Sequence, residues 1–129
     1  MKVLLDTNAY TRLALQIEPL MEIVENARTV FVSVTVLGEL YAGFRIGSKL
    51  EQNLRELESF LELPGVKIVE IDKDVADRYG LLVKLLREQG TPIPANDIWI
   101  AAAAMETGSR LVTYDKHFSV IPGLPLLSP

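Results

Sequence analysis

The sequence contains no cysteine, no long hydrophobic run and no excess of positive charge. Without cysteine there are no disulfides, thiol nucleophiles or thiolate metal sites, and a reducing cytoplasm is a compatible and expected location. The net charge of −4, from 17 acidic and 13 basic residues, argues against broad nucleic-acid binding through a basic surface. It leaves open a nucleic-acid enzyme whose site becomes positive only when a metal ion is bound.

Hydrophobic residues make up 49% of the chain but never form a long uninterrupted segment. The apolar run before Asp6 has only three residues, too few for a signal-peptide core, and no segment approaches the ~20 apolar residues of a membrane span. The length of 129 residues predicts a single domain over 1–129, which buries roughly two thirds of its unfolded surface. Apolar surface left over from the core would suit a partner or a dimer interface.

Short β-branched or apolar runs alternate with segments of helical periodicity. Strands are expected at Lys2–Leu5, Thr29–Ser33, Val66–Ile71, Arg110–Thr113 and Leu126–Leu127. Helices are expected at Ala9–Leu15, Pro19–Asn26, Thr35–Phe44, Ser48–Leu61, Asp72–Gln89 and Asp97–Glu106. Asn96 is expected to cap the last of these helices. This alternation predicts an α/β fold with a parallel sheet that is covered by helices on both faces.

Four acidic residues are expected at one edge of this sheet. In right-handed βαβ units the carboxyl ends of strands and the amino ends of helices lie along the same edge, where such folds bind ligands. Asp6 follows the first strand and Asp115 follows the fourth. Glu39 lies in the second turn of the helix after strand two, and Asp97 lies in the first turn of the helix before strand four.

Each of the four acids also has a purely structural interpretation. Asp6 and Asp97 suit helix amino termini, where a carboxylate caps the backbone or complements the helix dipole. Asp115 is compatible with an ordinary turn. Glu39 lies off the centre of its helix's apolar face, where a solvated glutamate is possible, although the nearby Gly43 would leave room for a ligand.

A cluster of carboxylates without thiolate or a nearby histidine selects a hard cation such as Mg²⁺ or Mn²⁺. One or two such ions could activate water and stabilise the charge that develops on a phosphodiester. Thr113 is placed to orient a carboxylate, although β-propensity explains it equally well. Four cations are candidates for attracting phosphate, and each is also typical of a solvated surface: Arg12, Arg45, Lys49 and Lys116. His117, the sole histidine, is more typical of a surface turn than of a catalytic role.

The motifs in their order resemble the PIN-domain ribonucleases, most closely the VapC-type toxins of prokaryotic toxin–antitoxin pairs. They are Leu5-Asp6-Thr7-Asn8, Glu39 within Leu37–Leu40, Asn96-Asp97 before an alanine-rich helix, and Leu111–Phe118. The resemblance implies the strand order 3-2-1-4-5, Mg²⁺- or Mn²⁺-dependent cutting of RNA, a homodimer and a cognate protein antitoxin. It makes Asp6, Glu39, Asp97 and Asp115 the acidic tetrad with Thr113 as a supporting hydroxyl. It also places the third strand at the periphery, so Asp72 is expected to be only a helix cap.

An antitoxin that binds as a helix needs apolar anchors on the toxin. The resemblance makes these residues candidates for its groove: Tyr10, Leu13, Leu15, Ile17, Phe44, Leu50, Leu54 and Leu57. About half of them are expected to belong to the ordinary core instead.

Two other functions are alternatives to the nuclease. A phosphate-relay or phosphatase-like Mg²⁺-binding domain also places aspartates at the carboxyl edge of a parallel sheet, but a phosphatase of the aspartyl-nucleophile type would need an acid where Asn8 stands. Glu39 would have no role in either. A catalytically silent PIN-fold binding module would keep four unpaired acids without a metal to offset their repulsion.

Overall fold

All five predicted strands form, in a computed structural model that describes residues 1–129. They are β1 (Lys2–Leu5), β2 (Thr29–Ser33), β3 (Val66–Val69), β4 (Arg110–Val112) and β5 (Leu126–Leu127). Every neighbouring pair is parallel, and the strand order is β3-β2-β1-β4-β5. The predicted α/β class and the order implied by the resemblance are therefore confirmed.

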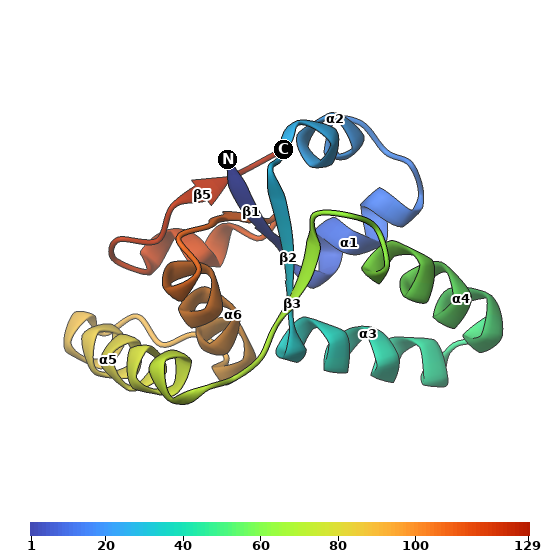
Figure 1. Cartoon of the computed structure of the whole chain (residues 1–129). Coiled ribbons are helices and arrows are strands. Elements are labelled where there is room, and N and C mark those ends of the chain that lie inside the picture. The colour runs from blue at the N-terminus through green and yellow to red at the C-terminus, as the bar shows by residue number, and fades with distance from the viewer.

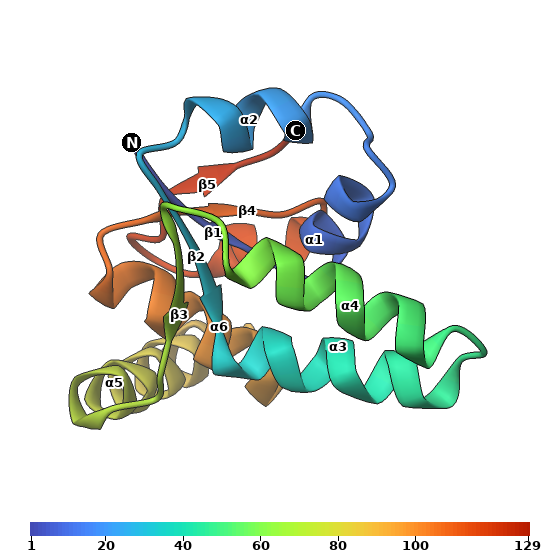
Figure 2. The same cartoon turned by 45° about the vertical axis from the view of Figure 1, so that its right-hand side comes forward.

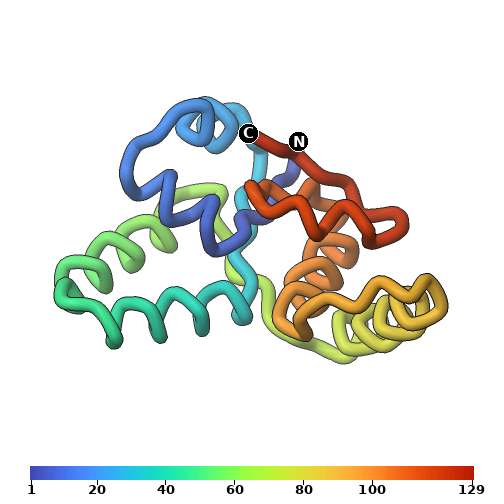
Figure 3. Tube along the Cα trace, turned by 180° about the vertical axis from the view of Figure 1, so that it is seen from behind, coloured from blue at the N-terminus to red at the C-terminus, as the bar shows by residue number.

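The helices divide between the two faces of the sheet. They are α1 (Thr7–Ala14), α2 (Leu20–Asn26), α3 (Val34–Ile46), α4 (Leu50–Leu61), α5 (Lys73–Gln89) and α6 (Ala95–Glu106), with a short 3₁₀ helix η1 (Lys116–Val120) that was not predicted. Figure 1 shows α5 and α6 on one side of the strands and α1, α3 and α4 on the other, a division also visible from behind in Figure 3. The pair α3 and α4 projects from the sheet as a helical hairpin (Figure 2). None of the helices combines the length and the apolarity needed to cross a lipid bilayer.

Side-chain caps fix where two of these helices begin. The Ser33 hydroxyl accepts a hydrogen bond from the Val36 N–H at 3.2 Å and starts α3 directly after β2. The Asp72 carboxylate accepts from the Val75 N–H at 2.9 Å and starts α5, which ends at Gly90 in the left-handed conformation (φ 72°) that favours glycine. The expected cap at Asp72 is therefore confirmed, and β3 lies at the edge of the sheet as the resemblance implied.

Several predicted boundaries differ from the observed ones by one or two residues, and two of these differences have a clear local cause. Strand β3 ends at Val69 because its only partner, β2, ends at the paired Ser33, which leaves the next two residues without a neighbouring strand. Helix α6 begins at Ala95, with Pro94 rather than Asn96 at the N-cap position. The Pro94 carbonyl accepts the N–H groups of Asp97 and Ile98, so Asn96 already lies within the first turn.

The core is centred on β1 and extends under α6. It contains 25 buried apolar residues, and Val3, Leu4 and Leu5 of β1 are fully buried. On α6 the run Ala101–Ala104 is also buried, and its small side chains allow the helix to pack closely on the sheet. The strand order reverses between β1 and β4, which is the place where open α/β sheets form a crevice at their carboxyl edge. Asp6 and Thr113 both lie there.

We expect Asp72→Ala to lower the free energy of unfolding by about 1 kcal/mol, because it removes the side-chain acceptor at the start of α5. Urea denaturation followed by circular dichroism would measure the change. The matched control is Asp74→Ala, since Asp74 lies exposed in the same first turn but makes no cap hydrogen bond. An equal loss in both variants would contradict the assignment of Asp72 as the cap.

Candidate active site

Asp6 lies at the junction of β1 and α1 and is 6% exposed. Its carboxylate accepts the Thr7 N–H on Oδ1 at 2.8 Å and the Thr113 hydroxyl on Oδ2 at 2.9 Å. Its backbone N–H donates to the Val112 carbonyl at 3.0 Å, which continues the pairing of β1 with β4. The backbone and the side chain of Asp6 therefore both join the two central strands at their carboxyl edge.

Burial raises the pKa of Asp6 above the ordinary value of 3.8, and the negative charges of Asp97 and Glu39 raise it further. The hydrogen bonds from Thr113 and Thr7 act in the opposite direction but do not offset the cost of desolvation. The contributions of Asp97 and Glu39 agree with their expected positions at the same edge of the sheet. That these acids form one site stays a prediction.

Glu39 is held at the same edge by a threonine. The Thr7 hydroxyl donates to Glu39 Oε1 at 2.6 Å, linking the first turn of α1 to the second turn of α3. Thr7 thus donates its backbone N–H to Asp6 and its side-chain O–H to Glu39. Glu39 is half-buried and hydrogen-bonded, so the alternative of an ordinary solvated glutamate is not supported.

Thr113 is buried and connects Asp6 with Asp115. Its hydroxyl donates to Asp6, and the same oxygen accepts the Asp115 N–H at 3.0 Å. Thr113 is 1% exposed, so both contacts are made away from solvent. Its position agrees with the supporting role that was expected, because it orients one carboxylate and fixes the backbone that carries another.

His117 joins the two remaining acids, Asp97 and Asp115. Its Nε2 lies 2.6 Å from Asp97 Oδ2 on α6, and its Nδ1 lies 2.5 Å from Asp115 Oδ1 at the start of η1. The contact with Asp97 is a hydrogen bond, whereas the contact of Nδ1 with Asp115 is an ion-pair contact. Asp115 also accepts the His117 N–H at 3.3 Å.

His117 is the residue that the sequence interpretation missed. It is more than a surface-turn histidine, because it bridges two acids of the tetrad from different elements. The available signal was its spacing, two residues after Asp115, which lets the side chain turn back onto that acid. Its second partner, Asp97, lies 20 residues away in the sequence, and nothing local indicates that contact.

The acids meet at one edge but are held by internal hydrogen bonds rather than around a common centre. No group of three or more acidic or histidine side chains is arranged to hold a metal ion as the side chains stand. Thr7 occupies an oxygen of Glu39, and His117 occupies oxygens of Asp97 and Asp115. The donor set itself, four carboxylates with no thiolate, is the kind that hard divalent cations prefer.

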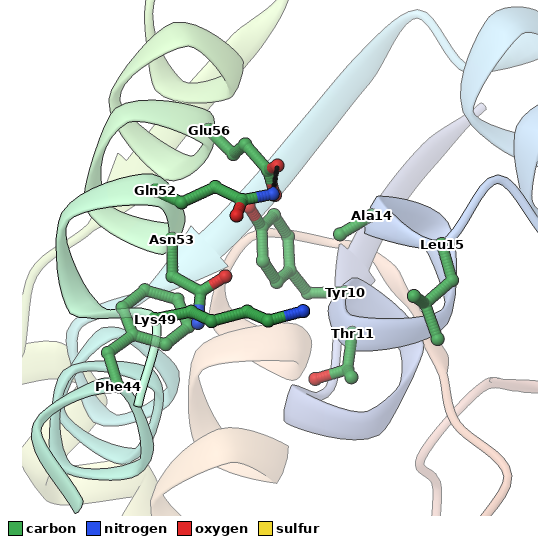
Figure 4. A pocket seen from close by; sticks show the side chains of 9 residues that line it. All are labelled: Tyr10, Thr11, Ala14, Leu15, Phe44, Lys49, Gln52, Asn53 and Glu56. Carbon is green, nitrogen blue, oxygen red and sulfur yellow. Dashed lines mark hydrogen bonds between the residues drawn. The ribbon is translucent and has the colours of Figure 1, made fainter. Parts of the chain in front are cut away.

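A groove of about 370 Å³ lies beside this edge, between α1 and α4 (Figure 4). It is lined by Tyr10, Thr11, Ala14, Leu15, Phe44, Lys49, Gln52, Asn53 and Glu56. A neighbouring hollow of about 280 Å³ adds Leu13, Gln16 and Phe60. Burial, together with the charge of Glu56, raises the pKa of Tyr10 to about 12, so its hydroxyl keeps its proton in the groove.

The structure separates the expected groove residues into two groups. Tyr10, Leu13, Leu15 and Phe44 line the groove or the adjoining hollow. Leu57 is buried in the core, and Leu50, Leu54 and Ile17 line neither hollow. Tyr10 and Leu57 belong to the buried core, and Leu13 and Phe44 pack partly buried against it, so the expectation that about half of the eight residues contribute to the ordinary core is confirmed.

Comparison with known proteins identifies the family. Residues 3–124 match the PIN domain family. Ribonuclease VapC4 of Mycobacterium tuberculosis is 33% identical over 97 residues, which is 75% of this chain and 75% of that protein. Ribonuclease VapC2 of Rickettsia felis is 34% identical over 107 residues, 82% and 78% of the two chains. The chain belongs to the VapC group of the PIN-domain family.

The fold of this VapC chain agrees with solved structures along its whole length. A chain in the crystal structure of VapBC2 from Rickettsia felis, bound to a DNA fragment from their promoter, matches with a TM-score of 0.88 at 31% identity and covers 98% of both chains. The PIN-like fold and the VapC resemblance expected from the motifs are both confirmed.

We expect the contribution of Asp6 to VapC stability to become less favourable as the pH rises. Its pKa is higher in the folded state than in the unfolded chain, so the folded state binds the proton more tightly. The unfavourable contribution is present in full above the folded-state pKa. It is lost as the pH falls through that pKa, and it is absent below the unfolded value of 3.8.

The measurement is the free energy of unfolding of wild-type protein and Asp6→Asn as a function of pH. The difference should move in favour of the variant between acidic and neutral pH. The control is Asp72→Asn, because Asp72 is exposed. It measures how the pH dependence of stability changes when an exposed carboxylate is removed. A difference that does not depend on pH would show that the burial of Asp6 carries no such cost.

Proposed function

We propose that this chain is a metal-dependent endoribonuclease that hydrolyses RNA phosphodiester bonds, the toxin of a VapBC-type toxin–antitoxin system. The observation that carries the proposal is the acidic edge: Asp6 is buried within the electrostatic reach of Asp97 and Glu39, and Thr113 ties it to Asp115. The names of the curated relatives, ribonucleases of the VapC group, support the same activity. We propose further that residues 1–129 act as one domain in the cytoplasm.

The residues that would hold the cofactor are Asp6, Glu39, Asp97 and Asp115, through carboxylate oxygens. Mg²⁺ or Mn²⁺ suits this set because both prefer oxygen ligands and bind phosphate oxygens readily. Such an ion supplies an activated water and stabilises the negative charge that builds on phosphate during in-line displacement. It also supplies the positive charge that this acidic edge itself lacks.

The chain's own residues position these ligands. Thr113 and the Thr7 N–H fix both oxygens of Asp6, which prevents the buried side chain from rotating away. Thr7 directs Glu39 toward the same place. His117 holds Asp97 and Asp115 side by side and offers a polar N–H group beside both acids. Its ring is 38% exposed, so it remains open to solvent and to a substrate at the rim of the site.

The alternatives are not favoured. A phosphate-relay or phosphatase-like site gives no role to Glu39, whereas Glu39 is bonded to Thr7 and acts on the charge of Asp6. A silent binding module gives no reason to bury Asp6 next to other acids, an arrangement that is unfavourable for the charged carboxylate.

We expect the purified protein to cut RNA in the presence of Mg²⁺ or Mn²⁺ and to lose this activity with EDTA. Asp97→Asn should reduce cleavage by more than about 100-fold, because changing residues outside the ligand shell of a metal already costs 10–100-fold. Asp6→Asn should have a comparable effect. Gel analysis of a labelled single-stranded RNA, at saturating metal, would measure the rates.

The control is Asp72→Asn, which removes an acid that also follows a strand but serves as a helix cap. It should cut RNA at the wild-type rate. Metal-independent cleavage, or full activity of both Asp6→Asn and Asp97→Asn, would refute the mechanism. Labelled phosphate retained on Asp6 would instead support the relay.

We propose that the cognate antitoxin places an apolar segment in the groove between α1 and α4. The groove combines an aromatic floor, Tyr10 and Phe44, with polar residues of α4 along its wall (Figure 4). This is the composition expected for a groove that receives an amphipathic helix. Related structures are described as VapBC complexes, including VapBC-1 from nontypeable Haemophilus influenzae, and we propose that this chain is also a homodimer.

We expect Ala14→Arg to weaken inhibition by the cognate antitoxin by at least about tenfold, because a long charged side chain would fill a hollow that is now open at Ala14. RNA cleavage without antitoxin should stay at the wild-type rate, since the tetrad is unchanged. The matched control is Ala76→Arg, an exposed position on α5 outside the groove. Titrating antitoxin into a cleavage assay would measure both, and equal inhibition of the Ala14 and Ala76 variants would exclude this groove.

A further inference from the structure

Arg12 forms a defined contact next to the acidic edge. Its guanidinium carbon lies 4.0 Å from the centre of the Tyr114 ring. Arg12 is in the last turn of α1, the helix that Asp6 caps. Tyr114 lies between Thr113 and Asp115 in the loop from β4 to η1. The contact therefore joins two segments that each carry a member of the tetrad.

The guanidinium has no acidic partner within the protein. Arg12 is exposed and takes part in none of the ion pairs, which involve Arg78, Lys84 and His117 as the basic partners. Stacking on an aromatic ring leaves the N–H donors around the edge of the guanidinium plane free. The ring also restricts the side chain, so less conformational freedom is lost when those donors bind an anion.

Helix α1 presents Arg12 away from the groove. The groove is lined from this helix by Tyr10, Thr11, Ala14 and Leu15, and Arg12 does not contribute to it or to the adjoining hollow. Its contact with Tyr114 instead directs it toward the loop that holds Asp115. A ligand of Arg12 would therefore lie on the side of the acidic edge, about 9 Å of helix rise from Asp6.

The other cations considered for phosphate binding are placed differently. Lys49 lines the groove, and Arg45 lies in the last turn of α3, at the opposite end of that helix from the sheet edge. Lys116 is close to Asp115, but its exposed side chain has no aromatic or hydrogen-bonding partner that fixes it. Arg12 alone among the four combines nearness to the tetrad with a fixed position.

We propose that Arg12, held against Tyr114, binds a backbone phosphate of the RNA next to the bond that is cut. The inference rests on the proposed endoribonuclease function and names the group that positions its substrate. An acidic edge repels a polyanion everywhere except at bound metal, so a fixed cation at the rim is needed to hold the flanking strand. Arginine suits this task because its N–H groups match two phosphate oxygens at once.

The test compares RNA binding and cleavage by Arg12→Gln with the matched control Arg28→Gln. Arg28 is exposed and precedes β2, at the opposite edge of the sheet, so this control makes the same change in net charge far from the site. Binding of a fluorescein-labelled single-stranded RNA pool is measured by anisotropy across a salt series, with Asp97→Asn present in all proteins to prevent cleavage. Cleavage of the same RNA is measured without that substitution.

Arg12→Gln should raise the Kd for RNA about tenfold, as expected for the loss of a charge-assisted contact. It should also reduce the slope of log Kd against log salt by about 0.7, the value for one phosphate contact on a single strand. Cleavage should show a raised KM with little change in kcat. Tyr114→Leu should lose part of the affinity, and Tyr114→Phe, which keeps the ring, should lose less.

Three results would overturn the inference. The first is that Arg12→Gln binds RNA with the same Kd and the same salt slope as the wild-type protein, while the wild-type protein binds and cuts RNA. This result would contradict the role of Arg12 but leave the nuclease assignment intact. The second is that Arg28→Gln weakens RNA binding as much as Arg12→Gln does, which would mean that affinity depends only on the net charge of the protein. The third is a loss of antitoxin binding without a loss of RNA binding in Arg12→Gln, which assigns the residue to the protein partner. If wild-type protein neither binds nor cuts RNA, both proposals fall together.

Discussion

The buried carboxylate of Asp6 is the interaction on which the acidic edge depends. Its two oxygens accept hydrogen bonds from Thr7 on α1 and Thr113 after β4, and each of these threonines then holds a second acid. Thr7 leads to Glu39 on α3, and Thr113 leads to the backbone of Asp115. His117 closes the chain of contacts by joining Asp115 to Asp97 on α6. Four acids from distant parts of the sequence are thus positioned by three intermediary side chains.

Burying the Asp6 carboxylate near other acids is electrostatically unfavourable, and the rest of the fold must offset this free energy. Burial and neighbouring acids raise the pKa of Asp6 even though it accepts two hydrogen bonds. Val3, Leu4 and Leu5 of β1 are fully buried, as is the alanine run of α6, so the backbone around Asp6 has little freedom to relax. Sites that are kept despite such a cost are characteristic of function, since activity commonly requires local arrangements that are not optimal for stability.

The sequence was sufficient for those features that depend on periodicity and topology. The bounds of β1, β2 and β5 were predicted as they occur, because apolar β-branched runs are bounded by turn residues. The position of the four acids at one edge followed from the alternation of strands and helices. Contacts between side chains were not predictable in the same way. The bridge made by His117 depends on η1, a single short turn without a periodic signal, and the end of β3 depends on the length of its neighbour.

Helix α1 connects the groove and the acidic edge through a short series of hydrogen bonds. Thr11 lines the groove, and its hydroxyl donates to the Thr7 carbonyl at 3.1 Å. Thr7 in turn holds both Asp6 and Glu39, while Arg12 on the adjoining side of the helix reaches Tyr114 beside Asp115. This single helix of eight residues therefore contributes to the groove, to the acidic edge and to the contact between Arg12 and Tyr114. Any partner that packs against Tyr10 and Ala14 therefore contacts the same helix that orients two of the four acids. The side chains that line the groove and the side chain of Arg12 lie on different sides of α1, so each side can be changed by substitutions that leave the acids in place.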